Sequence, residues 1–381
     1  MITPDTEAAL ADVIKSAAAP MHIQGGATRG FVVPGTPLST RYITGISLYE
    51  PGALTLVAAA GTTVRDIDQA LAAENQRLAF EPTDYRKLLG TTGEPTIGGV
   101  LATNASGPRR IQGGAARDYA LGVRFVDGNG AIVKNGGRVM KNVTGYDLVK
   151  LFSGSFGTLG VLTEVSLKVM PVPETQSTLM LHGLSDVAAV RAMADAMRSP
   201  FEVTGAAHGA YVEGEAAVTL LRLEGFEGSV AYRINALKDL LTGTGAQITV
   251  IDAAASAQVW RDIRDVTVMA KATGDVWRVS CKPSQAAELA QRADALSCAF
   301  DWSGGLIWVN TPPDTDLRAR LGVFDGHATL VRASEETRRR LPVFHPQSAG
   351  IERLCAGLRA RFDPRGILNK GLMDAPETEV A

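Results

Sequence analysis

The feature that most constrains this chain is a short uncharged stretch, TIGGVLATNASGP, at residues 96–108. It combines small residues with hydroxyl and amide side chains. Because glycine lacks a Cβ, successive backbone N–H groups in such a stretch can point the same way, and a ligand can approach the main chain closely. Neutral N–H and hydroxyl donors are suited to binding a diphosphate. The stretch therefore predicts a phosphate-binding loop, and the alternative interpretation is a glycine-rich turn between two strands.

Two similar stretches flank it, IQGGAT at residues 23–28 and GSFGTLGVLTE at residues 154–164. Together the three resemble the FAD-binding domain of the vanillyl-alcohol oxidase type, the PCMH fold, over most of residues 1–172. The resemblance implies that the first two loops hold the FAD diphosphate and that the third lies along the adenosine and flavin. The cofactor residues implied, including neighbours of the flavin ring, are Gly25, Gly26, Ala27, Thr28, Pro82, Thr83, Thr96, Gly98, Gly99, Thr103, Asn104, Ala105, Gly107, Gly160, Val161 and Asn369.

The local patterns around these loops predict scaffold elements. A helix is expected at the N-terminus, capped near Thr3 or Asp5. Strands are expected at residues 21–24 and 54–60, a helix at residues 65–74, and a hairpin turning at residues 127–130. The glycines at 154, 157 and 160 imitate a dinucleotide fingerprint. However, residues 161–169 are β-branched and alternating, so a strand follows where a Rossmann motif requires a helix.

The prolines at 171 and 173 mark a domain boundary. Residues 173–345 show a strand, helix, strand, strand, helix, strand order, which predicts a ferredoxin-like α+β cap domain. Its expected elements are strands at 178–181, 203–208, 217–223 and 246–251, with helices at 186–198 and 229–241; elements at 257–270, 276–280 and 284–296 extend it. The segment FDPRGILN at 362–369 resembles the family's closing motif, which implies that residues 346–381 return to the FAD domain. The expected fold is thus α+β, with two α/β subdomains in the PCMH-type part.

A narrower resemblance comes from MKNVTGYD at residues 140–147, between SGPRR and GSFGTLGVLTE. This set is similar to the FAD-binding E subunits of bacterial glycolate oxidases. This resemblance implies that the chain functions in a complex with a larger flavoprotein subunit and an iron–sulfur subunit. Lys141 or Tyr146 is a candidate contact for substrate or flavin, the alternative being that Tyr146 and Asp147 only hold the loop in place. Family members with covalent flavin often carry histidine at position 27, and this chain has Ala27, so the resemblance implies non-covalent FAD.

Oxidation of a 2-hydroxy acid such as glycolate or D-lactate requires a base for the hydroxyl proton and a cation for the carboxylate. Arg278 and His327 are the candidates, the alternative for His327 being a structural role. Arg109, Arg110 and Arg117 are further candidates for a diphosphate or carboxylate, or are solvated surface residues. The five histidines are scattered, so no metal site is expected.

The charge balance and the cysteine content limit the kinds of partner and cofactor that are expected for this chain. Lys plus Arg number 38 against 40 for Asp plus Glu, which gives no indication of nucleic acid or an anionic membrane as partner. The three cysteines form no CxxC pair, which argues against iron–sulfur ligation by this chain. No signal peptide or membrane span is expected, so the predicted location is cytoplasmic, with peripheral attachment to the inner membrane through partners.

The sequence therefore leaves three functional hypotheses. The main one is an FAD-binding subunit of a glycolate oxidase-like dehydrogenase, an FAD-dependent oxidoreductase acting on CH–OH groups. The first alternative is a self-sufficient hydroxy-acid or alcohol oxidoreductase that uses Arg278 and His327. The second is a flavin-holding structural subunit without turnover.

Overall fold

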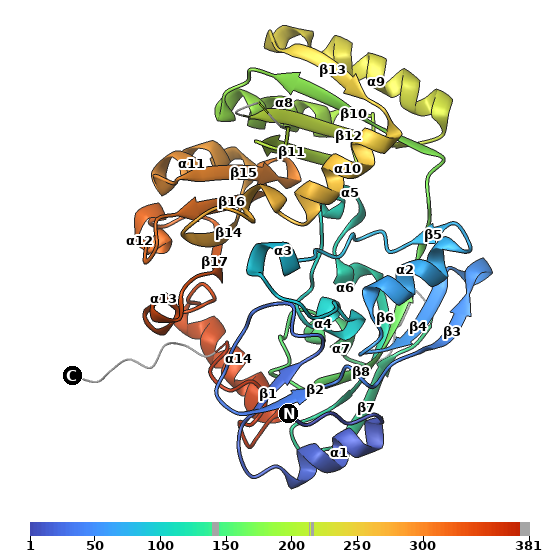
Figure 1. The fold of residues 1–381 in the computed structure, drawn as a ribbon, viewed down its shortest axis with the longest axis vertical. Helices are drawn as coiled ribbons and strands as arrows, with labels where there is room; N and C mark the ends of the chain where they lie inside the picture. Colours follow the sequence, from blue (N-terminus) through green and yellow to red (C-terminus); the bar gives the residue numbers. More distant parts are fainter. Residues whose placement is uncertain (139–144, 213, 215–216, 374–381) are drawn as a thin grey trace. The chain divides into compact units, whose positions relative to one another are not determined.

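The chain divides into two compact units (Figure 1). The computed structural model describes residues 1–138, 145–212, 214 and 217–373. The first unit consists of residues 1–106, 114–172 and 346–381, and the second of residues 107–113 and 173–345. Lys141 therefore lies outside the described residues.

The first unit contains a five-stranded antiparallel sheet with the order β3-β4-β8-β6-β7. Its strands are β3 (Ile46–Glu50), β4 (Thr55–Ala59), β6 (Ala120–Val126), β7 (Ile132–Gly136) and β8 (Val161–Lys168), with smaller pairs formed by β1 (Met21–Gln24) and β2 (Thr36–Ser39), and by β5 (Gln76–Arg77) and β9 (Met170–Pro171). Its helices are α1 (Glu7–Ser16), α2 (Val64–Ala72), α3 (Arg86–Leu89), α4 (Ile97–Ala102), α6 (Ala116–Tyr119), α7 (Leu148–Phe152) and α14 (Ala349–Phe362). The central strand β8 is buried on both faces along most of its length. The predicted strand after Gly160 is confirmed, and a Rossmann helix at this place is excluded.

Local sequence chemistry explains the ends of these elements. The predicted turn between β6 and β7 is confirmed, since the Asp127 carboxylate accepts hydrogen bonds from the backbone N–H groups of Asn129 at 2.9 Å and Ala131 at 2.8 Å. The predicted first helix is confirmed, and its cap lies one residue after Asp5: α1 begins at Glu7, and Thr6 Oγ1 accepts a hydrogen bond from Ala9 N. Thr3 precedes a proline, which disfavours helical backbone, and the neighbouring Ile2 N donates to Pro37 O in an extended pairing.

The second unit contains an eight-stranded antiparallel sheet among the described residues, with the order β13-β10-β12-β11-β15-β16-β14-β17. Its strands are β10 (Thr175–His182), β11 (Gly205–Gly209), β12 (Val218–Gly225), β13 (Gln247–Ile251), β14 (Asp275–Cys281), β15 (Ser297–Asp301), β16 (Leu306–Thr311) and β17 (Gly326–Arg332). Its helices are α5 (Arg110–Gly113), α8 (Asp186–Arg198), α9 (Glu227–Leu241), α10 (Ala253–Arg264), α11 (Ala286–Ala293), α12 (Leu317–Leu321) and α13 (Glu335–Arg340). The sheet is two ferredoxin-like βαββαβ repeats joined edge to edge through β11 and β15. The first repeat is the predicted one. The second was expected only as an extension that included a strand at 276–280 and a helix at 284–296, and its helix α12 has only five residues.

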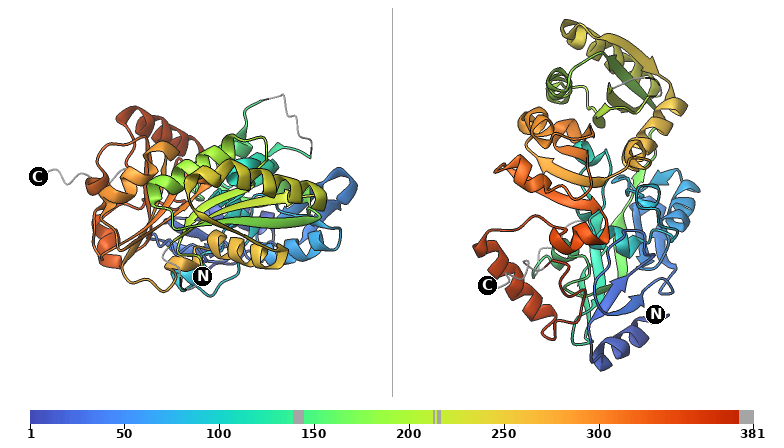
Figure 2. Two further views of the ribbon diagram at one scale, coloured as in Figure 1. Left: turned by 90° about the horizontal axis from the view of Figure 1, so that it is seen from above. Right: turned by 60° about the vertical axis from the view of Figure 1, so that its left-hand side comes forward.

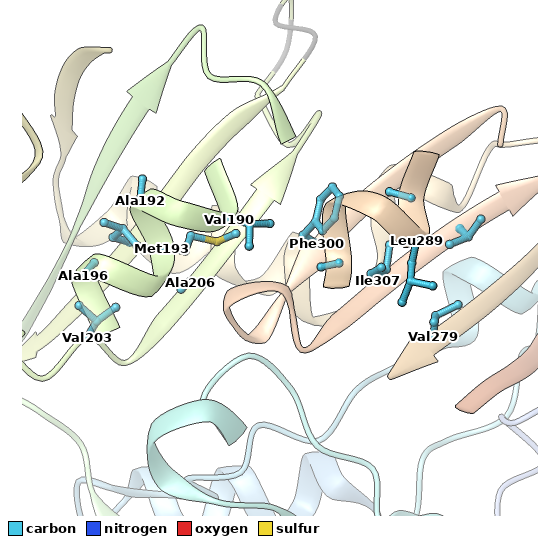
Figure 3. Packing of buried hydrophobic residues seen from close by; sticks show 14 of the residues in the cluster. Val190, Ala192, Met193, Ala196, Val203, Ala206, Val279, Leu289, Phe300 and Ile307 are labelled. Carbon is cyan, nitrogen blue, oxygen red and sulfur yellow. The ribbon is translucent and has the colours of Figure 1, made fainter. Parts of the chain in front are cut away.

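Alternation along the strands separates two apolar layers in this unit. Leu221 and Leu223 of β12 face α8 and α9, whereas Leu220 packs against Trp260 of α10 on the opposite face. The two faces are visible in Figure 2, with α8 and α9 covering one side of the sheet. Figure 3 shows the first layer continuing from Met193 of α8 to Phe300 and on toward α11. A strand with side chains alternating between two layers must be buried on both faces, and β12 is.

Residues 107–113 are tied to the second unit by buried polar contacts. The Arg109 guanidinium forms an ion pair with Glu224 of β12, with Nη2 to Oε1 at 2.6 Å, and both residues are almost fully buried. Arg233 donates to the backbone oxygen of Glu224 at 2.7 Å, and Trp302 Nε1 donates to Gly107 O at 3.1 Å. Arg109 is therefore a structural ion-pair residue in this fold.

We predict that Glu224→Gln lowers the free energy of unfolding of the second unit by about 3 kcal/mol, because it leaves the Arg109 charge buried without its counter-ion. All four tryptophans, at positions 260, 277, 302 and 308, lie in this unit, so urea unfolding followed by tryptophan fluorescence measures it directly. Glu335→Gln is the matched control, since its pair with Arg339 is exposed, and we expect a change within about 0.5 kcal/mol. Equal effects of the two substitutions would contradict the prediction.

Candidate cofactor site

The three small-residue loops converge on one cavity of about 350 Å³ in the first unit. Residues 22–33 form one part of its wall, and several residues between 95 and 103 form a second part. The third loop contributes Phe156, Gly157 and residues 160–162, and the C-terminal segment contributes Asn369 and Leu372. This size lies within the range of small-molecule and cofactor sites, about 300–1,000 Å³. The predicted residues that line it are Gly25, Gly26, Ala27, Thr28, Thr96, Gly98, Gly99, Thr103, Gly160, Val161 and Asn369.

Three glycines in and just before the first two loops lie too close to neighbouring atoms to carry a Cβ. A Cβ on Gly26 would lie 1.6 Å from the backbone oxygen of Glu94, and a Cβ on Gly93 would lie 1.7 Å from the backbone oxygen of Gly26. A Cβ on Gly25 would lie 2.3 Å from Thr96 Oγ1. These glycines therefore let the loops interlock. The sequence predicts that Gly25 and Gly26 leave room for a ligand, and both also line the cavity.

Free hydrogen-bond donors at the cavity come from the first loop. No described residue accepts a hydrogen bond from the backbone N–H groups of Gly26, Ala27 or Thr28. Ala27 is exposed and has φ 56°, a left-handed conformation that alanine adopts at a cost in free energy. Three neighbouring N–H donors beside a cavity can bind an anionic group such as a diphosphate.

The second loop is a short helix, α4, and its N-terminal donors are already used. Thr96 caps it, with Oγ1 accepting from Gly99 N at 3.3 Å. Ile97 N donates to Thr62 O at 3.0 Å, and Gly98 N donates to Ala60 O at 2.8 Å. The TIGG segment therefore acts as a wall and a support for the first loop, and its N-terminal N–H groups are bound to protein.

The third loop is fixed to the second by backbone hydrogen bonds. Gly154 N donates to Leu101 O at 3.1 Å, and Phe156 N donates to Ala102 O at 2.8 Å. Phe156 and Phe31 of the first loop meet edge to face, with ring centroids 5.4 Å apart. Phe31 and Phe156 line the cavity. The sequence did not predict this role, because an isolated aromatic residue in a loop belongs to no recognisable motif.

Asn369 connects the C-terminal segment to two of the loops. Its Oδ1 accepts a hydrogen bond from Ile23 N at 2.7 Å, while Nδ2 donates to Phe156 O at 2.8 Å and to Ile23 O at 3.3 Å. The side chain is buried, with 4% of the residue exposed. Its hydrogen bonds are thus directed at protein atoms of the first and third loops.

Five predicted cofactor residues do not line this cavity: Pro82, Thr83, Asn104, Ala105 and Gly107. Thr83 is buried and its Oγ1 donates to Ser106 O at 3.4 Å, while Asn104 Oδ1 accepts from Arg117 N at 3.0 Å. Ala105 packs in the core, and Gly107 belongs to the second unit. Tyr146 is 87% exposed, and its backbone oxygen accepts from Asn135 Nδ2.

Arg278 and His327 lie in the second unit, on the adjacent strands β14 and β17. The guanidinium of Arg278 stacks over the Trp302 ring at 4.9 Å, and that of Arg110 stacks over the same ring at 4.7 Å. Restricted hydration and the positive charges of Arg278, His345 and Arg110 lower the pKa of His327 to about 4. The imidazole is therefore neutral at pH 7 within a cationic cluster.

Two further features bear on cofactor chemistry. Across the described ranges, no group of three or more His, Cys, Asp or Glu side chains is arranged to hold a metal ion. The three cysteines are free, and burial raises the pKa of Cys281 to about 11 and that of Cys298 to about 12.

No described helix has the length and apolar character needed to cross a bilayer.

The fold and the three-loop cavity define the class of the protein. The family model "FAD binding domain" matches residues 1–136. Among solved structures, an alkyldihydroxyacetonephosphate synthase aligns with a TM-score of 0.68 over 97% of this chain and 76% of its own, at 15% identity. The chain is thus an α+β protein with a PCMH-type FAD-binding domain, from the FAD-linked oxidoreductases, as the sequence resemblance implied.

Sequence relatives narrow this class. The glycolate oxidase subunit GlcE of Escherichia coli is 34% identical over 361 residues, which cover 93% of each chain. The glycolate oxidase subunit GlcD of Bacillus subtilis is 38% identical over 131 residues, 34% of this chain and 24% of that one. A D-lactate dehydrogenase of Archaeoglobus fulgidus is 32% identical over 42% of this chain and 36% of its own. The chain belongs to the family of the glycolate oxidase subunit GlcE and is related to GlcD and to D-lactate dehydrogenases.

We predict that Gly98→Ala destabilises the FAD-free first unit by about 1–3 kcal/mol, because the new Cβ would lie 2.6 Å from Ala60 Cβ and 2.8 Å from Ala60 O. Gly99→Ala in the same helix is the control: its Cβ meets only Thr96 Oγ1, at 3.2 Å, and alanine favours helix. The measurement is urea unfolding by circular dichroism, in which the first unit is the transition without a tryptophan signal. A Gly98→Ala protein as stable as Gly99→Ala would show that the packing argument is wrong.

Proposed function

We propose that this chain binds FAD non-covalently and is the FAD-holding subunit of a glycolate oxidase-like complex that oxidises a small 2-hydroxy acid. The observation that carries the proposal is the cavity formed by the three separated loops, with free N–H donors on one of them. Identity of 34% to a glycolate oxidase subunit over 93% of the chain supports the substrate class and the assembly.

The residues present fit FAD in both polarity and reactivity. The N–H groups of Gly26, Ala27 and Thr28 supply neutral donors for the diphosphate, while Phe31, Phe156 and Val161 supply apolar wall for ring systems. Ala27 has no nucleophilic side chain that could bond to the isoalloxazine. When bound, FAD supplies an acceptor for a hydride or for single electrons. The chain itself orients the cofactor and excludes water from part of it.

On this proposal a larger flavoprotein subunit oxidises glycolate or D-lactate and an iron–sulfur subunit accepts electrons, while the FAD of this chain assists electron movement or shapes the assembly. The relationship to GlcD favours a common flavin-domain origin for the two kinds of subunit. Association through those partners would place this chain in the cytoplasm, peripheral to the inner membrane.

A second candidate function rests on the residues around Trp302, which we call the Trp302 cluster: Trp302, Arg110, Arg278 and His327. Arg278 and Arg110 provide guanidinium groups for a substrate carboxylate, and His327 lies beside Arg278 as the acceptor of a hydroxyl proton. A base with a pKa of about 4 accepts a proton weakly at pH 7. A bound carboxylate would offset the two arginine charges and raise that pKa only in part, because burial of the imidazole is the largest cause of the lowered pKa. A flavin-holding subunit without turnover is the remaining alternative.

The purified chain should be yellow, and acid precipitation should release the flavin into the supernatant, because Ala27 cannot hold it covalently. The measurement is the absorbance spectrum of pellet and supernatant, with identification of the released flavin as FAD. A colourless protein that does not take up added FAD would overturn the proposed function, and flavin retained in the pellet would overturn the non-covalent assignment.

Anaerobic glycolate or D-lactate should bleach the flavin only when the partner subunits are co-expressed. Bleaching of the isolated chain, abolished by Arg278→Ala, would favour the self-sufficient oxidoreductase. FAD that no donor reduces even in the assembled complex would favour the structural alternative.

The Trp302 cluster also gives a pH prediction. Because the pKa of His327 is about 4 in the folded chain and near 6.5 when unfolded, the unfolded chain binds more protons between these values. This residue therefore costs stability as the pH falls from 6.5 toward 4. We expect the melting temperature of His327→Gln minus that of the wild type to be larger at pH 5 than at pH 7.5. A difference that does not change with pH would contradict the lowered pKa.

A further inference from the structure

The C-terminal segment forms part of the cofactor cavity. Met21 N donates to Ile367 O at 2.7 Å, and Asn369 N donates to Met21 O at 3.1 Å, so the segment pairs with β1, which also pairs with β2. Arg365 fixes it further by donating to the carbonyl oxygens of Ala17 and Gly128. The segment thus delivers Asn369 to the start of the first loop with little freedom.

The amide of Asn369 matches the groups it meets. It offers an acceptor to one N–H group and donors to two carbonyl oxygens, those of Ile23 and Phe156. Its backbone has φ 47°, a left-handed conformation that asparagine tolerates better than most residues. These contacts join residues 346 and 213 positions away in sequence at one buried point.

We propose that Asn369 is a positioning residue for the cofactor: it clips the first loop to the third, so that FAD binding and anchoring of the C-terminal segment are thermodynamically linked. The inference rests on the proposed function, in which this cavity holds FAD. The first loop supplies the N–H donors and the third supplies Phe156 and Val161, so a cofactor that spans both needs their spacing fixed in advance. Binding then strengthens the clip, and loss of the clip weakens binding.

Three variants of the full chain test the clip. Asn369→Ala removes all three side-chain hydrogen bonds, and Asn369→Asp keeps an acceptor but places a carboxylate against two carbonyl oxygens. Lys370→Ala is the control, because Lys370 is exposed and adjacent. We expect titration with FAD to give at least tenfold weaker binding for Asn369→Ala, a similar or larger loss for Asn369→Asp at pH 8, and a change below twofold for Lys370→Ala.

A pH profile separates positioning from general destabilisation. The carboxyl group that Asn369→Asp introduces should have a raised pKa, because it is buried against carbonyl oxygens, and its protonated form regains one O–H donor. FAD affinity of Asn369→Asp should therefore recover in part between pH 8 and pH 6, while that of the wild type over the same range serves as the reference. Melting of each FAD-free variant shows whether it is folded at the titration temperature.

Hydrogen exchange of the FAD-free chain gives a readout that does not depend on the cofactor. In Asn369→Ala, residues 23–28 and 156–158 should exchange at least tenfold faster than in the wild type, and residues 363–373 should be protected by FAD in the wild type. If the variants bind FAD as the wild type does, or if loop exchange is unchanged, the clip is refuted. If the wild type itself binds no FAD while loop exchange responds to Asn369, the proposed function fails, and only the structural link that Asn369 makes between the two loops remains.

Discussion

The cofactor cavity depends on two glycines, Gly26 and Gly93, where two segments of main chain lie in close contact. Gly26 stands against the backbone oxygen of Glu94, and Gly93 stands against the backbone oxygen of Gly26, each at a distance where a Cβ would overlap the oxygen. No flexible side chain takes part, so the contact has no way to relax around a larger residue. The position of the first loop against the second is therefore set by backbone geometry. The directions of the N–H groups of Gly26, Ala27 and Thr28 follow from it.

Once the first two loops interlock, the remaining contacts form a connected series. The first turn of α4 is bound to Thr62 and Ala60, its last residues accept hydrogen bonds from the third loop, and Asn369 returns from the third loop to the first. In this closed series of contacts each of the three loops is held in position by hydrogen bonds or close packing to another loop. The donors of α4 are used within this series, which leaves the first loop as the part that can bind an anion.

The sequence predicts the elements whose signals are local. The strand after Gly160, the hairpin at Asp127 and the first βαββαβ repeat are marked by alternation and turn residues, and the structure contains them. The roles of Gly25 and Gly26 were not predictable in the same way, since a glycine needed for packing and a glycine needed for ligand access look identical in sequence. The ion pair of Arg109 with Glu224 spans 115 positions, and the amide of Asn369 reaches Ile23 across 346, so neither pattern signals its partner.

The charge around Trp302 shows why residue type alone does not define a catalytic base. A histidine of ordinary pKa suits proton abstraction near neutral pH, and this is the basis on which the sequence favours His327. Burial of the imidazole changes that property most, and the guanidinium groups of Arg278 and Arg110 add to the effect because they oppose a third positive charge. The cluster is consequently better suited to attracting an anion than to accepting a proton. On the hypothesis of a self-sufficient oxidoreductase, a bound carboxylate would offset the charges of Arg110 and Arg278, while burial would still hold the pKa of His327 low.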